Sequence, residues 1–153
     1  MAALDFLERS LVPAPLEARG FANFGEPLGE GGRMRLDLPP VAGPFLAVLE
    51  PGEVRFPWVI ERLERRREAS KVILPLGPHR FIIVVAPGLE APEWANIRAF
   101  LTAPGQGLGL RRGCWHLGPL ALDGGARFAL LDGSGEGASE MPAPFAIRLL
   151  RPV

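Results

Sequence analysis

Short apolar runs separated by proline and glycine dominate the hydrophobic pattern of this chain. Runs of Val, Ile, Leu and Phe end at pairs such as Pro51-Gly52 and Pro87-Gly88. Because such pairs favour turns while β-branched and aromatic residues favour strands, the pattern predicts many short strands. The predicted strands cover residues 45–49, 54–59, 71–76, 81–86, 97–102, 107–111, 115–122, 127–131 and 145–150. Their spacing predicts an all-β sandwich or barrel.

Helix is expected only near the N-terminus. Residues 15–21, PLEARGF, begin with proline and end near Gly20, as helices tend to do. Residues 1–9 are a second helical candidate. Near the other end, residues 133–139, GSGEGAS, are rich in glycine and serine, and this composition predicts a mobile loop before the last strand.

Length and composition limit the class of protein. The 153 residues fit one domain, 1–153, with 48% hydrophobic residues to fill its core. The 17 basic and 17 acidic residues balance, which disfavours a nucleic-acid partner. The longest apolar run, residues 81–87, is too short to span a membrane, and the single cysteine has no internal disulfide partner. The N-terminus also lacks a signal-peptide pattern, so we expect a cytoplasmic protein without a membrane partner.

The candidate chemistry is concentrated in residues 105–120, GQGLGLRRGCWHLGPL. A surface loop has little need of Trp115 and a plain core strand does not carry paired arginines, so we expect a strand whose polar face lines a pocket. Within it, His116 is the candidate for chemistry. The alternative is a histidine that only makes hydrogen bonds inside a β core. Cys114 is expected to be a small buried apolar group, with a nucleophilic thiol as the alternative.

The second part of the site is expected in residues 58–77, WVIERLERRREASKVILPLG. This segment is densely charged but continues directly into a predicted strand. The segment resembles the first motif of cupin barrels, which has two ligand positions one residue apart, a third several residues on, and a glycine after a hydrophobic strand. Glu64, Arg66, Lys71 and Gly77 occupy these positions. Arg62 and Arg65 are expected to face solvent. The alternative is that the whole charge run is a solvated face held by surface ion pairs.

Several segments in order along the chain carry a family resemblance. They are Gly20–Gly25 (GFANFG), Leu63-Glu64-Arg65, residues 97–102 (IRAFLT), Gln106-Gly107 and Trp115-His116. In these the chain resembles the ureidoglycolate lyase (ureidoglycolate hydrolase) family, cupin-fold enzymes of purine and allantoin breakdown. The resemblance implies a cupin-type double-stranded β-helix, or jelly-roll barrel, with a short N-terminal helix. It also implies cleavage of ureidoglycolate to glyoxylate and urea.

The chain departs from the family pattern at three pocket positions. Arg66 stands where the family usually has a histidine, Lys71 where it has a glutamine, and Leu117 where it has a second histidine. A cupin metal needs several imidazoles or carboxylates on one point, whereas guanidinium offers no lone pair and two cations repel a divalent ion. Although some family members have been associated with a divalent metal, we expect neither a metal nor another cofactor here.

The same residues favour a small anionic ligand. Arginine binds carboxylates through two parallel hydrogen bonds, and a low-dielectric pocket strengthens the contact. The expected substrate-binding residues are Arg66, Ser70, Lys71 and Arg112. For the family reaction, His116 is the expected base and Glu64 its proton partner. The result would be a cationic pocket that holds the carboxylate of a small substrate.

A different class of function is the alternative. The chain could be a divergent cupin that binds a small anionic metabolite, or a dimeric interaction module, without turnover. Catalysis requires Glu64, Arg66, Lys71 and His116 to converge in one open pocket, whereas an interaction module does not. A homodimer is expected in either case, because residues 39–49, PPVAGPFLAVL, carry more apolar surface than one strand buries.

Overall fold

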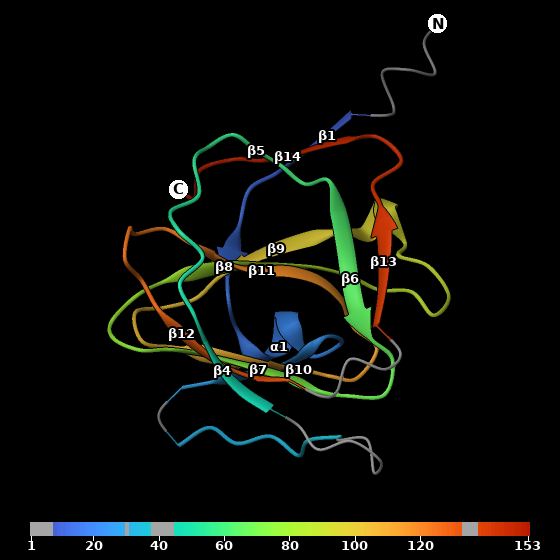
Figure 1. Cartoon of the computed structure of the whole chain (residues 1–153). Helices are drawn as coiled ribbons and strands as arrows, with labels where there is room; N and C mark the ends of the chain where they lie inside the picture. The colour runs from blue at the N-terminus through green and yellow to red at the C-terminus, as the bar shows by residue number, and fades with distance from the viewer. Residues whose placement is uncertain (1–7, 30, 38–44, 133–137) are drawn as a thin grey trace, which may run out of the picture.

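The computed structural model describes residues 8–29, 31–37, 45–132 and 138–153 and is built almost entirely of β-strands (Figure 1). The strands are β1 (Glu8–Leu11), β2 (Ala14–Pro15), β3 (Gly25–Leu28), β4 (Phe45–Leu49), β5 (Trp58–Val59), β6 (Arg62–Arg66), β7 (Lys71–Pro75), β8 (Phe81–Ala86), β9 (Arg98–Leu101), β10 (Gly107–Leu110), β11 (Trp115–Ala121), β12 (Phe128–Asp132), β13 (Ala138–Pro142) and β14 (Ala146–Leu149). Helix α1 spans Ala18–Phe21 and a 3-10 turn, η2, spans Trp94–Asn96. No helix among the described residues is long and apolar enough to cross a membrane.

Two sheets face each other and form the barrel. One has the strand order β3-β10-β7-β12-β4, and the other β13-β6-β11-β8-β9-β2. The chain passes repeatedly between the two, as from β6 to β7 and back to β8, and most neighbouring strands are antiparallel. The barrel interior is filled by large apolar side chains, among them Ile73, Phe81, Phe100, Leu108 and Phe128. The expected jelly-roll barrel is therefore confirmed.

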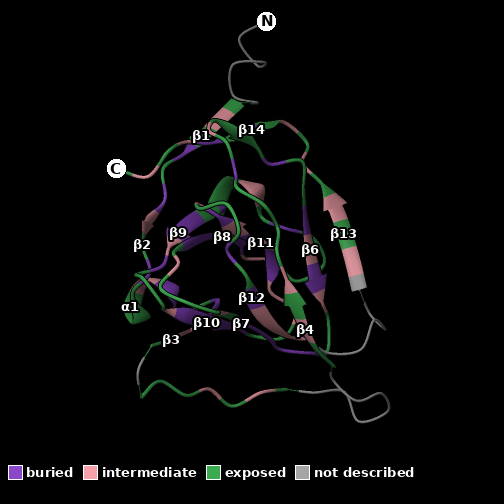
Figure 2. Ribbon diagram, turned by 60° about the vertical axis from the view of Figure 1, so that its left-hand side comes forward, coloured by how far each residue is buried: buried purple, intermediate pink, exposed green. Residues whose placement is uncertain are grey.

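A third, small sheet covers the outer face of the six-stranded sheet. It has the order β1-β14-β5 and lies above β8 and β11 in Figure 1. Leu11 and Ile147 from this sheet join Ile82, Val84 and Trp115 in a second apolar cluster. Because side chains alternate along a strand, β8 fills the barrel with one set of residues and this cluster with the other. All of β8 is buried, as the purple ribbon in Figure 2 shows.

The outer face of the five-stranded sheet is covered only in part by described residues: Met34 of segment 31–37 lies against Gly109 of β10, but the edge at β4 is open. At its edge, Leu46 and Val48 of β4 are 72% and 63% exposed. Val48 pairs with Ala129, which pairs with Leu74 of β7, so all three lie on the same side of the sheet. Leu74 is 41% exposed. Of the apolar stretch that predicted a dimer, residues 39–44 lie outside the described part of the chain, and residues 45–49 form β4.

The strand predictions are confirmed for the central barrel. The predicted strand 54–59 is mostly wrong, and the two helices predicted near the N-terminus are wrong in part. Strands β4 and β8 have the predicted boundaries. The predicted strand 54–59 reduces to β5, because Pro57 has no N–H to donate to a ladder. The helix expected over 15–21 shortens to α1, since Pro15 pairs with Leu101 in the parallel β2–β9 ladder. Of the helix expected over 1–9, Glu8 and Arg9 form part of β1, and residues 1–7 lie outside the described part.

Strands β1, β2, β3, β6 and β13 were missed, and the composition of β6 and β13 is not that of a strand. Strand β6 places arginine and glutamate on one face and therefore lacks the usual alternation of apolar and polar residues. Strand β13 pairs with β6 throughout its length. The loop predicted over 133–139 is wrong for Ala138 and Ser139, which begin β13, and residues 133–137 lie outside the described part. Both strands form the edge of the six-stranded sheet, where the polar residues of the site lie.

Truncation of Phe128 tests the barrel core. Its ring is fully buried and meets Phe81 edge-to-face with centroids 5.2 Å apart. Phe128→Ala should lower the free energy of unfolding by about 3–5 kcal/mol, because it removes apolar burial and leaves a cavity. Urea denaturation measures this value. Leu89→Ala, at an 87% exposed position, is the control and should change stability by less than about 0.5 kcal/mol.

Candidate functional site

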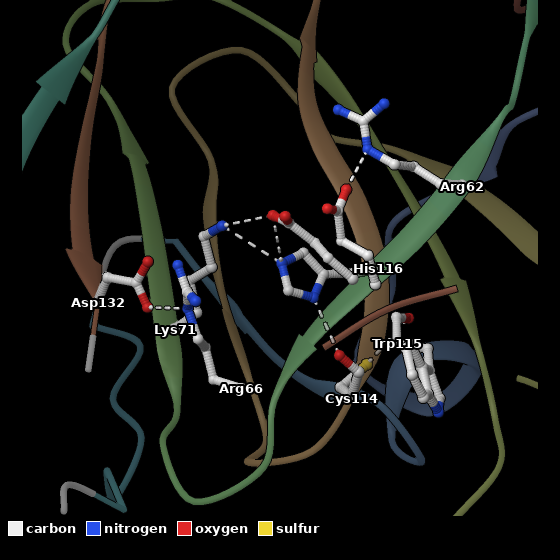
Figure 3. Close-up of polar contacts among 9 residues, drawn as sticks. Arg62, Arg66, Lys71, Cys114, Trp115, His116 and Asp132 are labelled. Carbon is white, nitrogen blue, oxygen red and sulfur yellow. Dashed lines mark hydrogen bonds and ion pairs between the residues drawn. The ribbon is translucent and has the colours of Figure 1, made fainter. Parts of the chain in front are cut away.

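Strands β6 and β11 place the polar residues of the site side by side on the barrel interior. Glu64 pairs directly with His116 across the β6–β11 ladder. Leu63, its neighbour on β6, points to the outer apolar cluster, so the alternation of the strand turns Glu64 and Arg66 inward. Lys71 begins β7 in the facing sheet, and Figure 3 shows it pointing toward His116. The two sheets thus bring Glu64, Lys71 and His116 into direct contact, with Arg66 beside them.

His116 is held in one tautomer by its two ring contacts. Its Nδ1 lies 2.9 Å from the carbonyl oxygen of Cys114, and its Nε2 lies 3.2 Å from Nζ of Lys71. A carbonyl oxygen only accepts, so Nδ1 carries the hydrogen and Nε2 accepts from the Lys71 ammonium. Burial, together with the charge of Lys71, lowers the pKa of His116 to about 3. The imidazole is therefore neutral at physiological pH.

Glu64 supplies the negative charge closest to Lys71. Its Oε1 lies 3.7 Å from Nζ of Lys71 and 3.8 Å from Nε2 of His116. The Lys71 side chain is only 8% exposed, whereas that of Glu64 is 42% exposed. Because an unpaired buried cation is costly, Glu64 offsets the charge of Lys71 while remaining in contact with solvent. It is the member of the cluster that a molecule from solvent meets first.

Arg66 forms a second ion pair beside the first. Its Nε lies 3.4 Å from Oδ1 of Asp132, a buried carboxylate at the end of β12 (Figure 3). The analysis of the sequence missed Asp132. The available signal was a charged residue that ends an apolar strand, FALLD, which is where a barrel strand reaches its rim. Asp132 fixes the orientation of Arg66 and leaves its remaining N–H groups free for a ligand.

A narrow crevice lies against this cluster. Its lining residues are Arg66, Ala69, Lys71, Leu110, Arg111, Cys114 and His116. It encloses about 150 Å³ of empty space, and the described side chains leave no part of it wide enough for a water molecule. Arg111 also lines a neighbouring cleft of about 720 Å³. The predicted residues therefore converge, but the pocket is closed rather than open.

Two predicted binding residues lie elsewhere. Arg112 is exposed in the turn between β10 and β11 and lines the larger clefts but not the crevice. Arg111, its neighbour in the sequence, lines the crevice, where Arg112 was expected. Ser70 is 2% exposed, and its Oγ accepts a hydrogen bond of 2.9 Å from the backbone N–H of Asp37. Ser70 thus holds the segment before β4 against the barrel instead of facing the crevice.

Arg65 does not face solvent as expected, whereas Arg62 does. The Arg65 side chain points to the outer apolar cluster, where its guanidinium lies 4.3 Å from the ring centroid of Trp115 and donates to the Leu89 carbonyl. Cation–π contact of this kind suits arginine, whose planar group is weakly hydrated. Arg62 is half-exposed and pairs with Glu140. Only part of the charge run is therefore a solvated face.

Cys114 lines the crevice but is a poor nucleophile. Burial raises the pKa of its thiol to about 12. The reactive form of cysteine is the thiolate, and such a site keeps it protonated. The expectation of a small, mainly apolar group fits this environment better than the nucleophilic alternative.

A divalent metal does not fit the donors at this point. Within the described ranges, no three His, Cys, Asp or Glu side chains converge in a way that could hold an ion. The lone pair of His116 Nε2 accepts from Lys71, and the charges of Lys71 and Arg66 oppose a second cation. The expectation of a metal-free site stays a prediction, now supported by this donor set.

Comparison with known proteins identifies the family. Residues 41–144 match the family model described as Ureidoglycolate lyase. The chain belongs to the ureidoglycolate lyase family. A protein of Rhodobacter capsulatus named ureidoglycolate lyase is 32% identical, over 94% of this chain and 98% of that protein. Proteins of the same name from Pseudomonas savastanoi and Stutzerimonas stutzeri are 31% and 30% identical, each over 84% of this chain and 86% of its own length.

The matched residues include the strands that carry the candidate site. They include β6, β7 and β11, which carry Glu64, Lys71 and His116. They also include β12 with Asp132. The matched region therefore contains all the charged and polar residues that meet at the crevice.

The low pKa of His116 predicts a loss of stability in acid. The unfolded chain binds a proton near the ordinary histidine pKa, about 6.5, whereas the folded chain does not until about pH 3. The contribution of His116 to the free energy of unfolding is therefore fully present above pH 6.5 and is lost as the pH falls toward 3. From pH 7.5 to pH 5, His116 should account for about 2 kcal/mol of lost unfolding free energy.

Urea denaturation of His116→Asn at both pH values measures this contribution. The variant should lose about 2 kcal/mol less than the unsubstituted protein over that interval. His79→Asn, which removes the other histidine of the chain, is the matched control and should keep the original dependence. An unchanged dependence in His116→Asn would show that the imidazole is not held neutral.

Proposed function

We propose that this chain is a ureidoglycolate lyase, which cleaves ureidoglycolate to glyoxylate and urea in purine and allantoin breakdown. The observation that carries the proposal is that Arg66, Lys71 and His116 line one interior crevice, while Glu64 pairs with Lys71 beside it. Family membership supplies the substrate class, and the crevice supplies charges that suit it. A molecule with one carboxylate and several hydrogen-bonding groups matches this mixed cationic and acidic site.

Arg66 and Arg111 are the proposed carboxylate ligands. Both line the crevice, and the ion pair with Asp132 leaves part of the Arg66 guanidinium unpaired. Arginine side chains bind a carboxylate through parallel hydrogen bonds, which fixes the orientation of the substrate. The substrate would displace these side chains from their closed positions, and closure around it would exclude water.

The geometry revises the proposed proton transfers. His116 accepts protons poorly because its pKa is about 3, and its free nitrogen already accepts from Lys71. Glu64, a more exposed carboxylate, is the better base for the substrate hydroxyl. As that proton leaves, the oxygen electrons form the aldehyde of glyoxylate and the carbon–nitrogen bond breaks. The Lys71 ammonium gives a proton to the departing nitrogen, so that urea leaves neutral.

In this scheme His116 is a positioning residue. Its Nδ1–H is fixed by the Cys114 carbonyl, so that Nε2 holds the Lys71 ammonium at one point. Glu64 then returns its proton to Lys71 across 3.7 Å, which restores both groups. The cycle needs no group other than the described side chains.

Lys71→Gln tests the proposed chemistry. Loss of the ammonium removes the proton donor and one positive charge, and kcat/KM for urea release should fall by about a hundredfold or more. Arg62→Gln is the matched control, because Arg62 is half-exposed on the neighbouring β6, and its activity should stay within about twofold. Urea and glyoxylate are measured against the rate of breakdown in buffer alone. Unchanged activity in Lys71→Gln would contradict the assigned role.

A binding module without turnover is the second candidate, and the closed crevice is the observation that favours it. Such a protein would bind ureidoglycolate or another small carboxylate, detectable by calorimetry, but release no urea above the buffer rate. Binding without release would therefore replace the lyase proposal with this one.

We further propose that the protein acts as a homodimer in the cytoplasm. The exposed apolar side chains of Leu46, Val48 and Leu74 on the open part of this sheet face support a symmetric contact. A single cysteine, Cys114, is compatible with a reducing compartment.

Sedimentation velocity tests this assembly. The unsubstituted protein should sediment as a dimer at micromolar concentration, and Val48→Glu should shift it to monomer, because a buried unpaired carboxylate is costly. Leu89→Glu is the control, since Leu89 is also exposed but lies away from this sheet face, and it should remain dimeric. Sedimentation of the unsubstituted protein as a monomer would rule out the proposed dimer.

A further inference from the structure

Lys71 is the single lysine among the 17 lysine and arginine residues of this chain. At every other basic position, including all those at the surface, the chain uses arginine. A lysine that served only as a positive charge could have been arginine here too. Its place is also unusual, because the residue is 7% exposed and faces the interior crevice rather than solvent. Both observations indicate a need for an amine at this point.

An amine differs from a guanidinium in its chemistry. Arginine remains charged in proteins, whereas lysine can lose a proton and then attack a carbonyl carbon. The proton needs an acceptor close to Nζ. His116 Nε2 at 3.2 Å carries a lone pair directed at Nζ, and Glu64 Oε1 at 3.7 Å is a carboxylate. Glu64 is therefore the built-in acceptor for the proton that Lys71 must lose, while the lone pair of His116 holds Nζ in place.

We propose that Lys71 reacts reversibly with the carbonyl carbon of glyoxylate and forms an imine within the crevice. This inference rests on the proposed lyase function for its carbonyl compound. In that function, Lys71 gives its proton to the departing urea and is left as an amine beside the aldehyde that has just formed. The lyase step thus creates both reactants of the imine in contact with each other.

The atoms of the step balance without another reagent. The Nζ lone pair attacks the aldehyde carbon, the carbon–oxygen π electrons move to the oxygen, and one Nζ proton passes to that oxygen through Glu64, so that a neutral carbinolamine forms. Loss of water then gives the imine, and addition of water reverses the step and releases glyoxylate. Arg66 and Arg111 line the same crevice and can bind the carboxylate of glyoxylate meanwhile.

Reductive trapping tests the imine. The folded protein is incubated at neutral pH with glyoxylate and cyanoborohydride, which reduces the imine carbon–nitrogen double bond. Mass spectrometry of peptides should show one carboxymethyl group on Lys71. Lys71→Arg keeps the positive charge but should not be labelled at this position. Because the chain has no other lysine, a labelled lysine in the unsubstituted protein can only be Lys71.

An exposed lysine provides the reference rate. Arg127→Lys introduces one at an exposed position before β12 and leaves Lys71 in place. In this variant, Lys71 should be labelled at least about tenfold faster than the lysine at position 127, because Glu64 lies beside Lys71 to take its proton and the crevice arginines can bind the glyoxylate carboxylate. The difference should disappear in urea, where the site is unfolded. Labelling of Lys71 at or below the reference rate would overturn the imine site.

The trapping experiment is independent of the lyase assay, because it starts from glyoxylate. Labelling of Lys71 in a protein that releases no urea would uphold the imine site and count against the proposed function. Urea release by a protein whose Lys71 stays unlabelled would overturn the imine site and leave the lyase function standing.

Discussion

The six-stranded sheet is buried on both faces, and this constraint determines where the charged residues of β6 lie. Its inner face packs on the barrel core and its outer face on the cluster covered by β1, β14 and β5. A charged side chain on such a sheet must find a partner or reach the rim. Arg65 does so by stacking on Trp115, and Glu64 by pairing with Lys71. The candidate site is therefore where the charged residues of the inner face pair with one another.

The ion pairs of Lys71 and Arg66 stabilise these buried cations and still leave N–H groups that can bind a ligand. Lys71 and Arg66 are offset by Glu64 and Asp132, and His116 contributes no charge because its pKa is about 3. Each cation keeps unsatisfied donor capacity, since neither ion pair uses all its N–H groups. The same arrangement that stabilises the buried charges thus leaves donors available for an anionic ligand.

Much of the barrel could be predicted from the sequence, because its central strands are continuous apolar runs. Residues 81–86 are buried on both faces and match the predicted strand. Strands β6 and β13 could not be recognised, since neither shows the alternation of apolar and polar residues that marks a strand, and the charge run of β6 resembles a solvated surface. Glu64, Arg66, Lys71 and His116 were identified by type and spacing, but Asp132 and Arg111 were not, because their neighbours come from distant segments.

By itself the sequence determined the all-β class, the turn positions and the residue types able to carry out chemistry, because these depend on local propensity and composition. Only the tertiary structure decided which charges meet. The pairing of β6 with β11 joins Glu64 to His116, and the facing sheet brings Lys71 within 3.2 Å of the same ring. It also decided that Arg65 points outward and that Ser70 serves the fold. These outcomes depend on register and on sheet packing, which place together side chains that are far apart along the chain.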